Sequence, residues 1–411
     1  MRPDPAAAQN WQVGEGWVPQ VAGDRPGQGS VHSQRPPGFP ERALRIREVR
    51  VTPISIPLLK QLRMATASPT VRESVVVEIR TDDGLLGIGD GMVAPYFSGE
   101  TLGSAVYAVD RLLSPRLIGS SAFDIGVVVA SMDAVLAGNG AAKAAIEIAL
   151  HDLVGRALGV PIHQLLGGKV RQVADATWMV TAEDPQAAAE DALEGIGQGF
   201  GAVKVKVGAH SPKADVARLR AIRRAVGPDV HLRPDANQAW TAREAIAVLR
   251  ELEPEGLQLI EQPTRRGDLA ALIEVAARVA IPLALDEGVF DAEDALRHIR
   301  TGAAGGVMIK LIKSGGIEGA WRLASVLDAA GLPFQMAGMP GETSIAAAAA
   351  AHLAVALPRL GWDCGIGVHA AAGDVVTQPL KPAGGAYRPP DGPGLGLDLD
   401  PDALARWRGE A

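Results

Sequence analysis

Cysteine is almost absent from this chain. The 411 residues contain one cysteine, Cys364, so no disulfide can form within the chain. This usage is typical of a reducing compartment. No apolar run reaches the roughly 20 residues that a helix needs to cross a bilayer. The sequence therefore predicts a soluble, cytoplasmic protein with no membrane partner.

Positive charge is also in deficit. The chain has 40 Lys and Arg against 47 Asp and Glu, which gives a formal net charge of −7. A nucleic-acid-binding surface needs a basic face to pair with phosphates. The balance of charge therefore predicts no nucleic-acid partner and favours a small-molecule ligand.

Residues 1–42 lack aliphatic runs and are rich in Pro, Gly, Gln and charged residues. Such a segment buries too little apolar surface to fold by itself. No apolar core follows its early charges, so it does not read as a secretory signal. We expect residues 1–42 to form a disordered amino-terminal extension.

Residues 43–160 mix strand and helix signals. A strand is predicted at Ile46–Pro57, followed by a hairpin of 74–80 and 85–89 that turns at Asp82-Asp83-Gly84. Helices are predicted at about 101–117, 122–135 and 140–158. This segment is expected to form an α+β domain.

From about Ala174 the pattern alternates between strand and helix. Amphipathic helices such as Pro212–Val226 and Ala242–Leu252 separate short apolar runs, and Thr241 with Glu244 forms a capping-box pattern. Strands are predicted near 175–180, 202–207, 230–236, 257–262, 282–287, 306–311, 333–338 and 365–369. Eight such units predict an α/β fold, a (β/α)8 TIM barrel over 161–373. Residues 374–411 are expected to return to the first domain.

Ionisable residues stand at the ends of five predicted strands. They are Lys204 with Lys206, Asp235, Glu261, Asp286 and Lys310, at intervals of about 25 residues, which is one strand-helix unit. The carboxyl ends of barrel strands converge on one mouth, where barrel enzymes hold their active sites. The spacing therefore predicts that these side chains face one space.

Asp235, Glu261 and Asp286 point to a metal. Three carboxylates in one low-dielectric mouth repel one another unless a cation lies among them. Oxygen ligands favour Mg2+, or Mn2+, over zinc. The alternative is that each acid pairs with a barrel lysine or caps the following helix.

The lysines are expected to enter the same mouth. Side chains alternate along a strand, so Lys204 and Lys206 point together while the flanking valines point outward. Lys310, three strands beyond Asp235, should approach a bound substrate from the side opposite Lys206. Glu287 is a candidate ion-pair partner for Lys310 or, alternatively, a surface acid. Asn237 is a candidate to orient Asp235.

The combined pattern resembles the muconate lactonizing enzyme subgroup of the enolase superfamily. Besides the strand-end residues, the segment IKLIKSGG around Lys310, the hairpin GLLGIGDG and the helix at 144–168 are similar to that family. The resemblance covers roughly 43–400. It implies a capping domain (43–160) over a modified TIM barrel, Mg2+ held by the three acids, and a homo-oligomer.

The resemblance also implies a reaction. An α-proton next to a carboxylate is very weakly acidic, so its removal requires a metal-stabilised enolate. Lys206 is expected to act as base on one side, Lys310 as acid or base on the other, and Lys204 to stabilise the enolate. Two opposed lysines favour a racemase or epimerase of an amino acid derivative. A muconate-type cycloisomerase, a dehydratase, or a metal-binding barrel without catalysis are the alternatives.

Substrate contacts are expected in the loops 58–72 and 91–99 and at the last strand ends. Aromatic residues make up 4% of the chain, and the candidates near the mouth are Trp178, Tyr96 and Phe97, with His369 at the last strand. The family's dipeptide epimerases carry an Asp-x-Asp pair there, whereas this chain has Asp363 alone. The dipeptide assignment is weakened accordingly.

Overall fold

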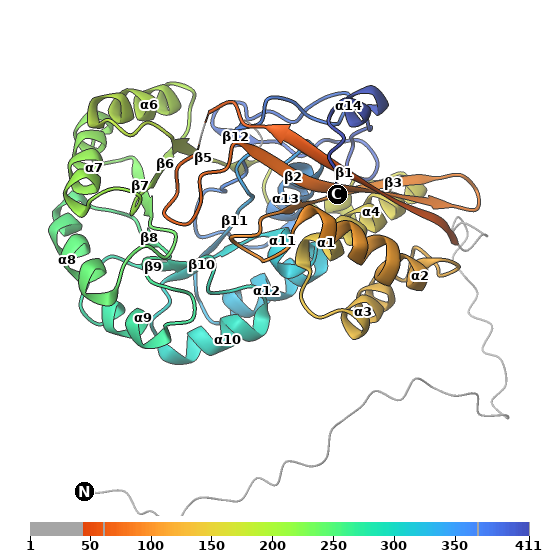
Figure 1. Cartoon of the computed structure of the whole chain (residues 1–411), viewed down its shortest axis with the longest axis horizontal. Coiled ribbons are helices and arrows are strands. Elements are labelled where there is room, and N and C mark those ends of the chain that lie inside the picture. The colour runs from red at the N-terminus through yellow and green to blue at the C-terminus, as the bar shows by residue number, and fades with distance from the viewer. Residues whose placement is uncertain (1–43, 61, 368–369, 411) are drawn as a thin grey trace, which may run out of the picture. The chain divides into compact units, whose positions relative to one another are not determined.

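The computed structural model describes residues 44–60, 62–367 and 370–410 (Figure 1). The predicted extension 1–42 and the candidate His369 lie outside these residues. Within the described part of the chain, no helix is both long and apolar enough to span a bilayer.

An antiparallel sheet of three strands opens the described chain. Its strands are β1 (Ile46–Pro57), β2 (Val71–Thr81) and β3 (Leu86–Val93), paired in that order. β2 and β3 form the predicted hairpin, with Gly84 at φ +87° in its turn, a conformation that glycine adopts without strain.

Glycines on β3 allow a long helix to lie directly on the sheet. Added Cβ atoms at Gly87, Gly89 and Gly91 would each come within 2.2 Å of a backbone oxygen of α4 (Gly140–Leu158). α4 is buried from Ala141 to Gly155 because the sheet covers one side and the barrel another. The other helices here are α1 (Leu102–Tyr107), a π-helical turn (Ala108–Leu113), α2 (Ser114–Leu117), α3 (Ile125–Val135) and α5 (Ile162–Leu165).

A curled parallel sheet forms the centre of the second part (Figure 1). Its strands follow one another in sequence order, because each crosses to its neighbour through a helix. They are β5 (Thr177–Val180), β6 (Ala202–Lys206), β7 (His231–Asp235), β8 (Ile260–Glu261), β9 (Leu283–Leu285), β10 (Gly306–Ile309) and β11 (Phe334–Met336).

The eighth predicted strand is not a regular strand in the described chain. Single parallel bridges join Cys364 to Ala176 and Gly365 to Ala337. These bridges connect the segment after α13 to both edges of the sheet and close the barrel. Glycines at 365 and 367 give this segment few side chains to pack, which weakens it as a strand.

Helices surround the sheet (Figure 1). The predicted helices at 212–226 and 242–252 are confirmed, and the capping box of Thr241 and Glu244 is present. The helices are α6 (Pro185–Gly197), α7 (Pro212–Val226), α8 (Ala242–Leu252), a 3-10 turn (Glu253–Glu255), α9 (Leu269–Ala276), α10 (Ala292–Thr301), α11 (Leu311–Ser314), α12 (Ile317–Ala329) and α13 (Ser344–Ala356).

α4 is tied to the segment that follows β10. The Glu147 carboxylate accepts hydrogen bonds from the backbone N–H groups of Ile317 (2.8 Å) and Glu318 (2.9 Å) at the start of α12. Negative charge stabilises a helix amino terminus, because that end carries unpaired N–H groups. The first part of the chain therefore holds the start of α12, which follows the short helix after Lys310.

The last segment contacts both parts of the chain. It contains β12 (Ala386–Tyr387), which pairs with β4 (Ala174–Asp175), and α14 (Pro401–Arg406). Just after α14, the carbonyl of Trp407 accepts a hydrogen bond from Ser55 of β1 at 2.8 Å.

Candidate active site

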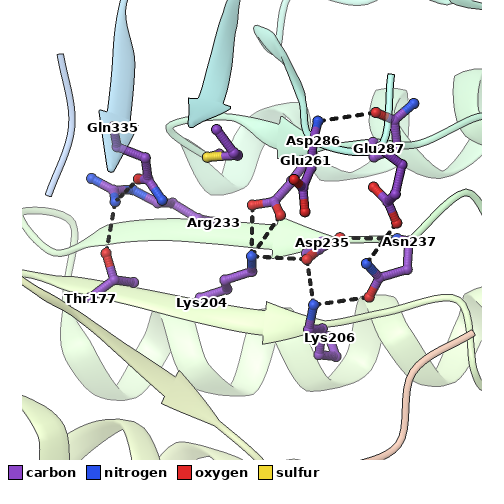
Figure 2. A network of polar contacts seen from close by, with 12 residues as sticks. Thr177, Lys204, Lys206, Arg233, Asp235, Asn237, Glu261, Asp286, Glu287 and Gln335 are labelled. Atoms are coloured by element: carbon purple, nitrogen blue, oxygen red, sulfur yellow. Dashed lines mark hydrogen bonds and ion pairs between the residues drawn. The ribbon is translucent and has the colours of Figure 1, made fainter. Parts of the chain in front are cut away.

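Six ionisable side chains meet at the carboxyl ends of the strands. Figure 2 labels the two lysines of β6 and the three acids. We call them the mouth cluster. The sheet order places the acids of β7, β8 and β9 between the lysines of β6 and β10. Its members are Lys204, Lys206, Asp235, Glu261, Asp286 and Lys310. The sequence prediction that these side chains face one space agrees with this geometry.

The β6 lysines bind the acids of the next two strands. The Lys204 ammonium lies 2.9 Å from Asp235 and 2.6 and 2.8 Å from the two oxygens of Glu261. The Lys206 ammonium lies 2.6 Å from Asp235 and donates to Asn237 Oδ1 at 2.9 Å. The strand register brings these groups together, since Lys206 of β6 pairs with Asp235 of β7, and Asp235 pairs with Glu261 of β8.

Lys310 enters from the other side of the acids. Its ammonium lies 2.6 Å from Asp286, 3.5 Å from the sulfur of Met339 and 4.5 Å from the ring centre of Phe97. Lys313 is fully buried behind it and donates to Asp286 Oδ1 (2.9 Å) and to the carbonyls of Asp286 and Met308 (both 2.7 Å). Asp286 is thus held by two ammonium groups.

Asn237 links two parts of the cluster, and Glu287 differs from its predicted role. Asn237 N–H donates to Asp235 at 3.0 Å, and its Nδ2 donates to Glu287 at 3.1 Å. Glu287 makes no ion pair with Lys310 among the described residues, because Asp286 takes that ammonium. It is also not a surface acid, since it is 3% exposed.

The backbone after two of the acids is strained. Asn237, Gln238 and Gln262 have φ values of +40°, +69° and +36°, which non-glycine residues seldom adopt. The turn at Gln262 lets its side chain accept hydrogen bonds from the N–H groups of Asp286 (3.1 Å) and Gly288 (3.0 Å). Gln262 thereby fixes the backbone that carries Asp286.

Burial and charge shift the pKa values of the lysines in opposite directions. Burial lowers the pKa of Lys206, with the Lys204 ammonium acting in the same sense against the attraction of Asp235. Burial acts the same way on Lys310, but the carboxylate of Asp286 outweighs it and raises the pKa. The two flanking amines are therefore not equivalent.

The acids differ as well. Burial and the nearby charge of Asp235 raise the pKa of Glu261 to about 8. Burial also disfavours the charge on Asp235, but Lys204 and Lys206 outweigh it and lower the pKa. The carboxylates are therefore close enough to repel one another through a low-dielectric interior.

The donor chemistry of the acids fits a hard divalent cation. Among the described residues no three acid, histidine or cysteine side chains are drawn together tightly enough to form a metal site by themselves. Lys204 lies between Asp235 and Glu261, and lysines also hold Asp286. The mutual repulsion of three buried oxygen donors is what a dication relieves.

Of the aromatic residues predicted to contact substrate, one lies at the mouth cluster and two are bound to other residues. Phe97 reaches Lys310, whereas the Tyr96 hydroxyl accepts a hydrogen bond from Arg72 at 2.8 Å. The Trp178 indole donates to Asp191 of α6 at 2.9 Å and packs edge-on against Phe200. The structure does not bring Trp178 into the mouth cluster, because its neighbours on β5 take the inward positions.

Three residues of the site carry no distinct signal in the sequence. The sequence allows Lys313, just past the strand, to be exposed or bound to backbone carbonyls, and the structure shows the second. Gln262 stands beside a stronger candidate acid, and Met339 lies in a loop of small residues. Gln262 could have been found from its place directly after an acid at a strand end. Met339 could not.

The fold and the mouth cluster define a class of barrel enzymes in which buried acids stand between two lysines at the strand ends. The chain belongs to the mandelate racemase / muconate lactonizing enzyme family of the enolase superfamily. The family model described as "Mandelate racemase / muconate lactonizing enzyme, N-terminal domain" matches residues 46–167, and the model described as "Enolase C-terminal domain-like" matches residues 187–403. The predicted family and fold class are confirmed.

Individual relatives cover most of the chain. A "Hydrophobic dipeptide epimerase" of Enterococcus faecalis is 38% identical over 80% of this chain and 93% of its own length. The structure of muconate lactonizing enzyme from Pseudomonas fluorescens, complexed with muconolactone, has a TM-score of 0.86 and 30% identity, covering 90% of this chain and 100% of that one.

A dipeptide epimerase structure from Enterococcus faecalis, complexed with Mg and the dipeptide L-Leu-L-Tyr, has a TM-score of 0.80 and 34% identity, covering 86% of this chain and 99% of that one. The relatives include epimerases and cycloisomerases, so the predicted class of isomerase is confirmed.

Proposed function

We propose that this protein is an isomerase that removes the proton α to a substrate carboxylate and returns one to the opposite side. The observation that supports this most directly is the placement of two amines, the largely buried Lys206 and the buried Lys310, on opposite sides of the acids Asp235, Glu261 and Asp286. Racemisation or epimerisation of an amino acid derivative uses both amines in this way. Muconate-type cycloisomerisation and dehydration begin with the same proton removal and stay as second candidates.

The two lysines would move the protons of the reaction. In one direction the Nζ of Lys206 takes the α-proton, and the ammonium of Lys310 gives a proton to the other side of the same carbon. After this step Lys206 is an ammonium and Lys310 a neutral amine, so the reverse direction exchanges the two roles. A lowered pKa at Lys206 and a raised pKa at Lys310 support this starting state.

Lys204 is placed to stabilise negative charge on the substrate carboxylate. It lies between two acids on the same side of β6 as Lys206, and Asp235 and Glu261 raise its pKa despite burial. An ammonium that stays charged can pair with the oxygen that gains charge as the α-proton leaves. Lys204 therefore acts by electrostatics and not by proton transfer.

Asp235, Glu261 and Asp286 are the residues that would hold Mg2+, with Mn2+ as a substitute. When bound, such a cation supplies positive charge against the charge that develops on the substrate carboxylate. Asn237 would orient Asp235, and Gln262 and Lys313 would orient Asp286. The related dipeptide epimerase complexed with Mg supports this choice of ion.

The domain roles and the compartment are part of the proposal. Residues 43–160 would cap the barrel of 161–373, with the hydrogen bonds of Glu147 joining the two and residues 374–411 returning to the first. The single cysteine suits the cytoplasm, because a reducing compartment does not favour disulfides. Burial raises the pKa of the Cys364 thiol to about 12, which keeps it unreactive.

Exchange of the α-proton with solvent tests the proposal. The protein is incubated in D2O with Mg2+ and a panel of N-acylated amino acids, dipeptides and hydroxy acids, and deuterium at the α-carbon is followed by NMR. Enzyme-dependent exchange in at least one class is expected. Absence of exchange with every carboxylate would favour a barrel that binds metal without catalysis.

A further inference from the structure

A cavity of about 250 Å3 lies beside the mouth cluster. It lies between the loop that follows β1, the carboxyl end of β5 and α6, and exposed residues line its solvent side. Its apolar walls include Leu58, Leu62, Trp178, Met179, Pro340 and Pro382. No member of the mouth cluster lines it, so its chemistry is separate from that of the lysines and acids.

The cavity adjoins both lysines through its walls. Met179 of β5 pairs in register with Lys204 of β6, and in-register neighbours on parallel strands point to the same side. On the other side, Pro340 follows Met339, whose sulfur lies 3.5 Å from the Lys310 ammonium. A substrate held between the lysines therefore has its remote end next to this cavity.

Charged groups at the cavity are paired or exposed. Asp191 accepts hydrogen bonds from the Trp178 indole and from the Thr181 N–H, both at 2.9 Å. Lys60 and Glu194 are exposed and lie at the solvent side. A charged ligand group that lies among the apolar walls, away from Lys60 and Glu194 at the solvent side, would lose water without gaining a partner, which is costly. An apolar group loses no such hydrogen bonds and gains burial.

We infer that this cavity receives the part of the substrate remote from the carboxylate, and that this part is an uncharged apolar acyl group or side chain. The inference rests on the proposed function. It selects, among amino acid derivatives, those with a neutral apolar end over those with a second carboxylate or a free ammonium group.

Three matched probes test whether the cavity receives the acyl group of the substrate. N-hexanoyl-alanine, N-succinyl-alanine and N-(6-aminohexanoyl)-alanine share the α-carbon and carboxylate but end in a methyl, a carboxylate and an ammonium. A second set places the same charges on the side chain, as N-acetyl-norleucine, N-acetyl-glutamate and N-acetyl-lysine. The α-proton exchange of each is measured as kcat/KM in D2O with the full-length protein and Mg2+.

The neutral member of at least one set is expected to exceed both charged members by about tenfold or more, because a charged group enters an apolar pocket unpaired. Equal rates across both sets, or preference for a charged member in both, would overturn the inference while leaving the proposed function intact. No exchange with any derivative would overturn both.

Variants of the cavity wall sharpen the test. Leu58→Lys places an ammonium in the cavity and is expected to shift the preference by about tenfold toward the succinyl or glutamate probe. Leu296→Lys, on the exposed face of α10, adds the same charge elsewhere and should change nothing. If Leu58→Lys does not fold, Met179→Ala enlarges the cavity, and preference should move toward longer acyl chains. An unchanged probe ranking in a folded cavity variant would contradict the inference.

Discussion

Two polar networks lie inside the barrel, and they differ in how completely their charges are paired. The Arg233 network lies deeper, two residues before Asp235 on the same side of β7. Its guanidinium donates to Thr177 (2.9 Å), Gln335 (3.1 Å) and the carbonyl of Asp363 (2.9 Å), and also to Gln258. One buried charge there has a full set of acceptors.

The mouth cluster crowds several charges of each sign. Its acids repel one another, which contributes to a pKa of about 8 for Glu261, and its backbone has positive φ values at Asn237 and Gln262. Glu287 Oε2 has no partner among the described residues. The contrast indicates that the Arg233 network stabilises the barrel, whereas the mouth cluster is arranged for a ligand.

Removing either flanking lysine gives the largest expected effect on activity and separates the two networks most clearly. Lys206→Ala and Lys310→Ala should each lower the rate of racemisation by about 10³-fold or more, because a proton donor or acceptor is lost. The rate is followed by polarimetry. Folding should be kept, with an unfolding midpoint near that of the parent protein.

Lys213→Ala, at an exposed position of α7, is the matched control and should keep full activity. A near-normal racemisation rate in Lys206→Ala would contradict the assignment of that lysine.

Arg233→Met should have the opposite profile. Loss of the guanidinium leaves buried acceptors unsatisfied, and we expect a loss of about 3 kcal/mol in the free energy of unfolding. Urea unfolding followed by circular dichroism measures it. Arg224→Met, on the exposed surface of α7, is the control and should cost little. An unchanged stability in Arg233→Met would remove the contrast between the networks.

Gln262→Ala tests a residue that acts on the mouth cluster through another. The substitution leaves the N–H groups of Asp286 and Gly288 without their acceptor, so Asp286 should be held less firmly. We expect the exchange rate to fall by about tenfold or more, with metal affinity falling in parallel. Titration with Mn2+ followed by electron paramagnetic resonance measures that affinity. Gln238→Ala, at the other strained turn, is the control and should leave the affinity for Mn2+ unchanged.

A buried histidine pair outside the barrel mouth gives the smallest expected effect on activity and acts on stability instead. His352 Nδ1 lies 2.9 Å from His163 Nδ1, and burial lowers the pKa of His352 to about 3. As the pH falls, His352 is therefore protonated in the unfolded chain, at its ordinary pKa of about 6.5, before it is protonated in the folded protein. The contribution to stability is complete above that pH and is lost as the pH falls, by about 1.4 kcal/mol per unit.

Urea unfolding between pH 7 and pH 5 measures this loss, and His352→Gln should have a flatter dependence on pH than the parent protein. Equal slopes in the two proteins would contradict the role of burial at this pair. Racemase activity should not follow the pair, since it touches no residue of the mouth cluster.

Much of the fold and the mouth cluster could be predicted because the signals are local or periodic. Charged residues end apolar runs once per strand-helix unit, so the mouth positions of Lys206, Asp235 and Lys310 follow from spacing alone. The capping box of Thr241 and Glu244 is also local. Each of these features depends on few residues close together in the sequence.

What could not be predicted depends on contacts between distant segments. Gln262 reaches the backbone of Asp286, and Lys313 turns back to the carbonyl of Met308, which only the packed barrel decides. Trp178 points to the side of β5 opposite Thr177 and Met179, where its indole donates to Asp191 of α6, and it still lines the cavity beside the mouth cluster. The last barrel segment lacks a regular strand because its glycines weaken the pairing signal.

The most direct test of the central claim separates the two lysines by substrate handedness. Solvent deuterium exchange is measured for each enantiomer of one active N-acylated amino acid in Lys206→Ala and in Lys310→Ala. Each variant should keep exchange with one enantiomer and lose it with the other, and the retained enantiomer should differ between the variants. Loss of exchange for the same enantiomer in both variants would contradict the placement of the two amines on opposite sides of the substrate.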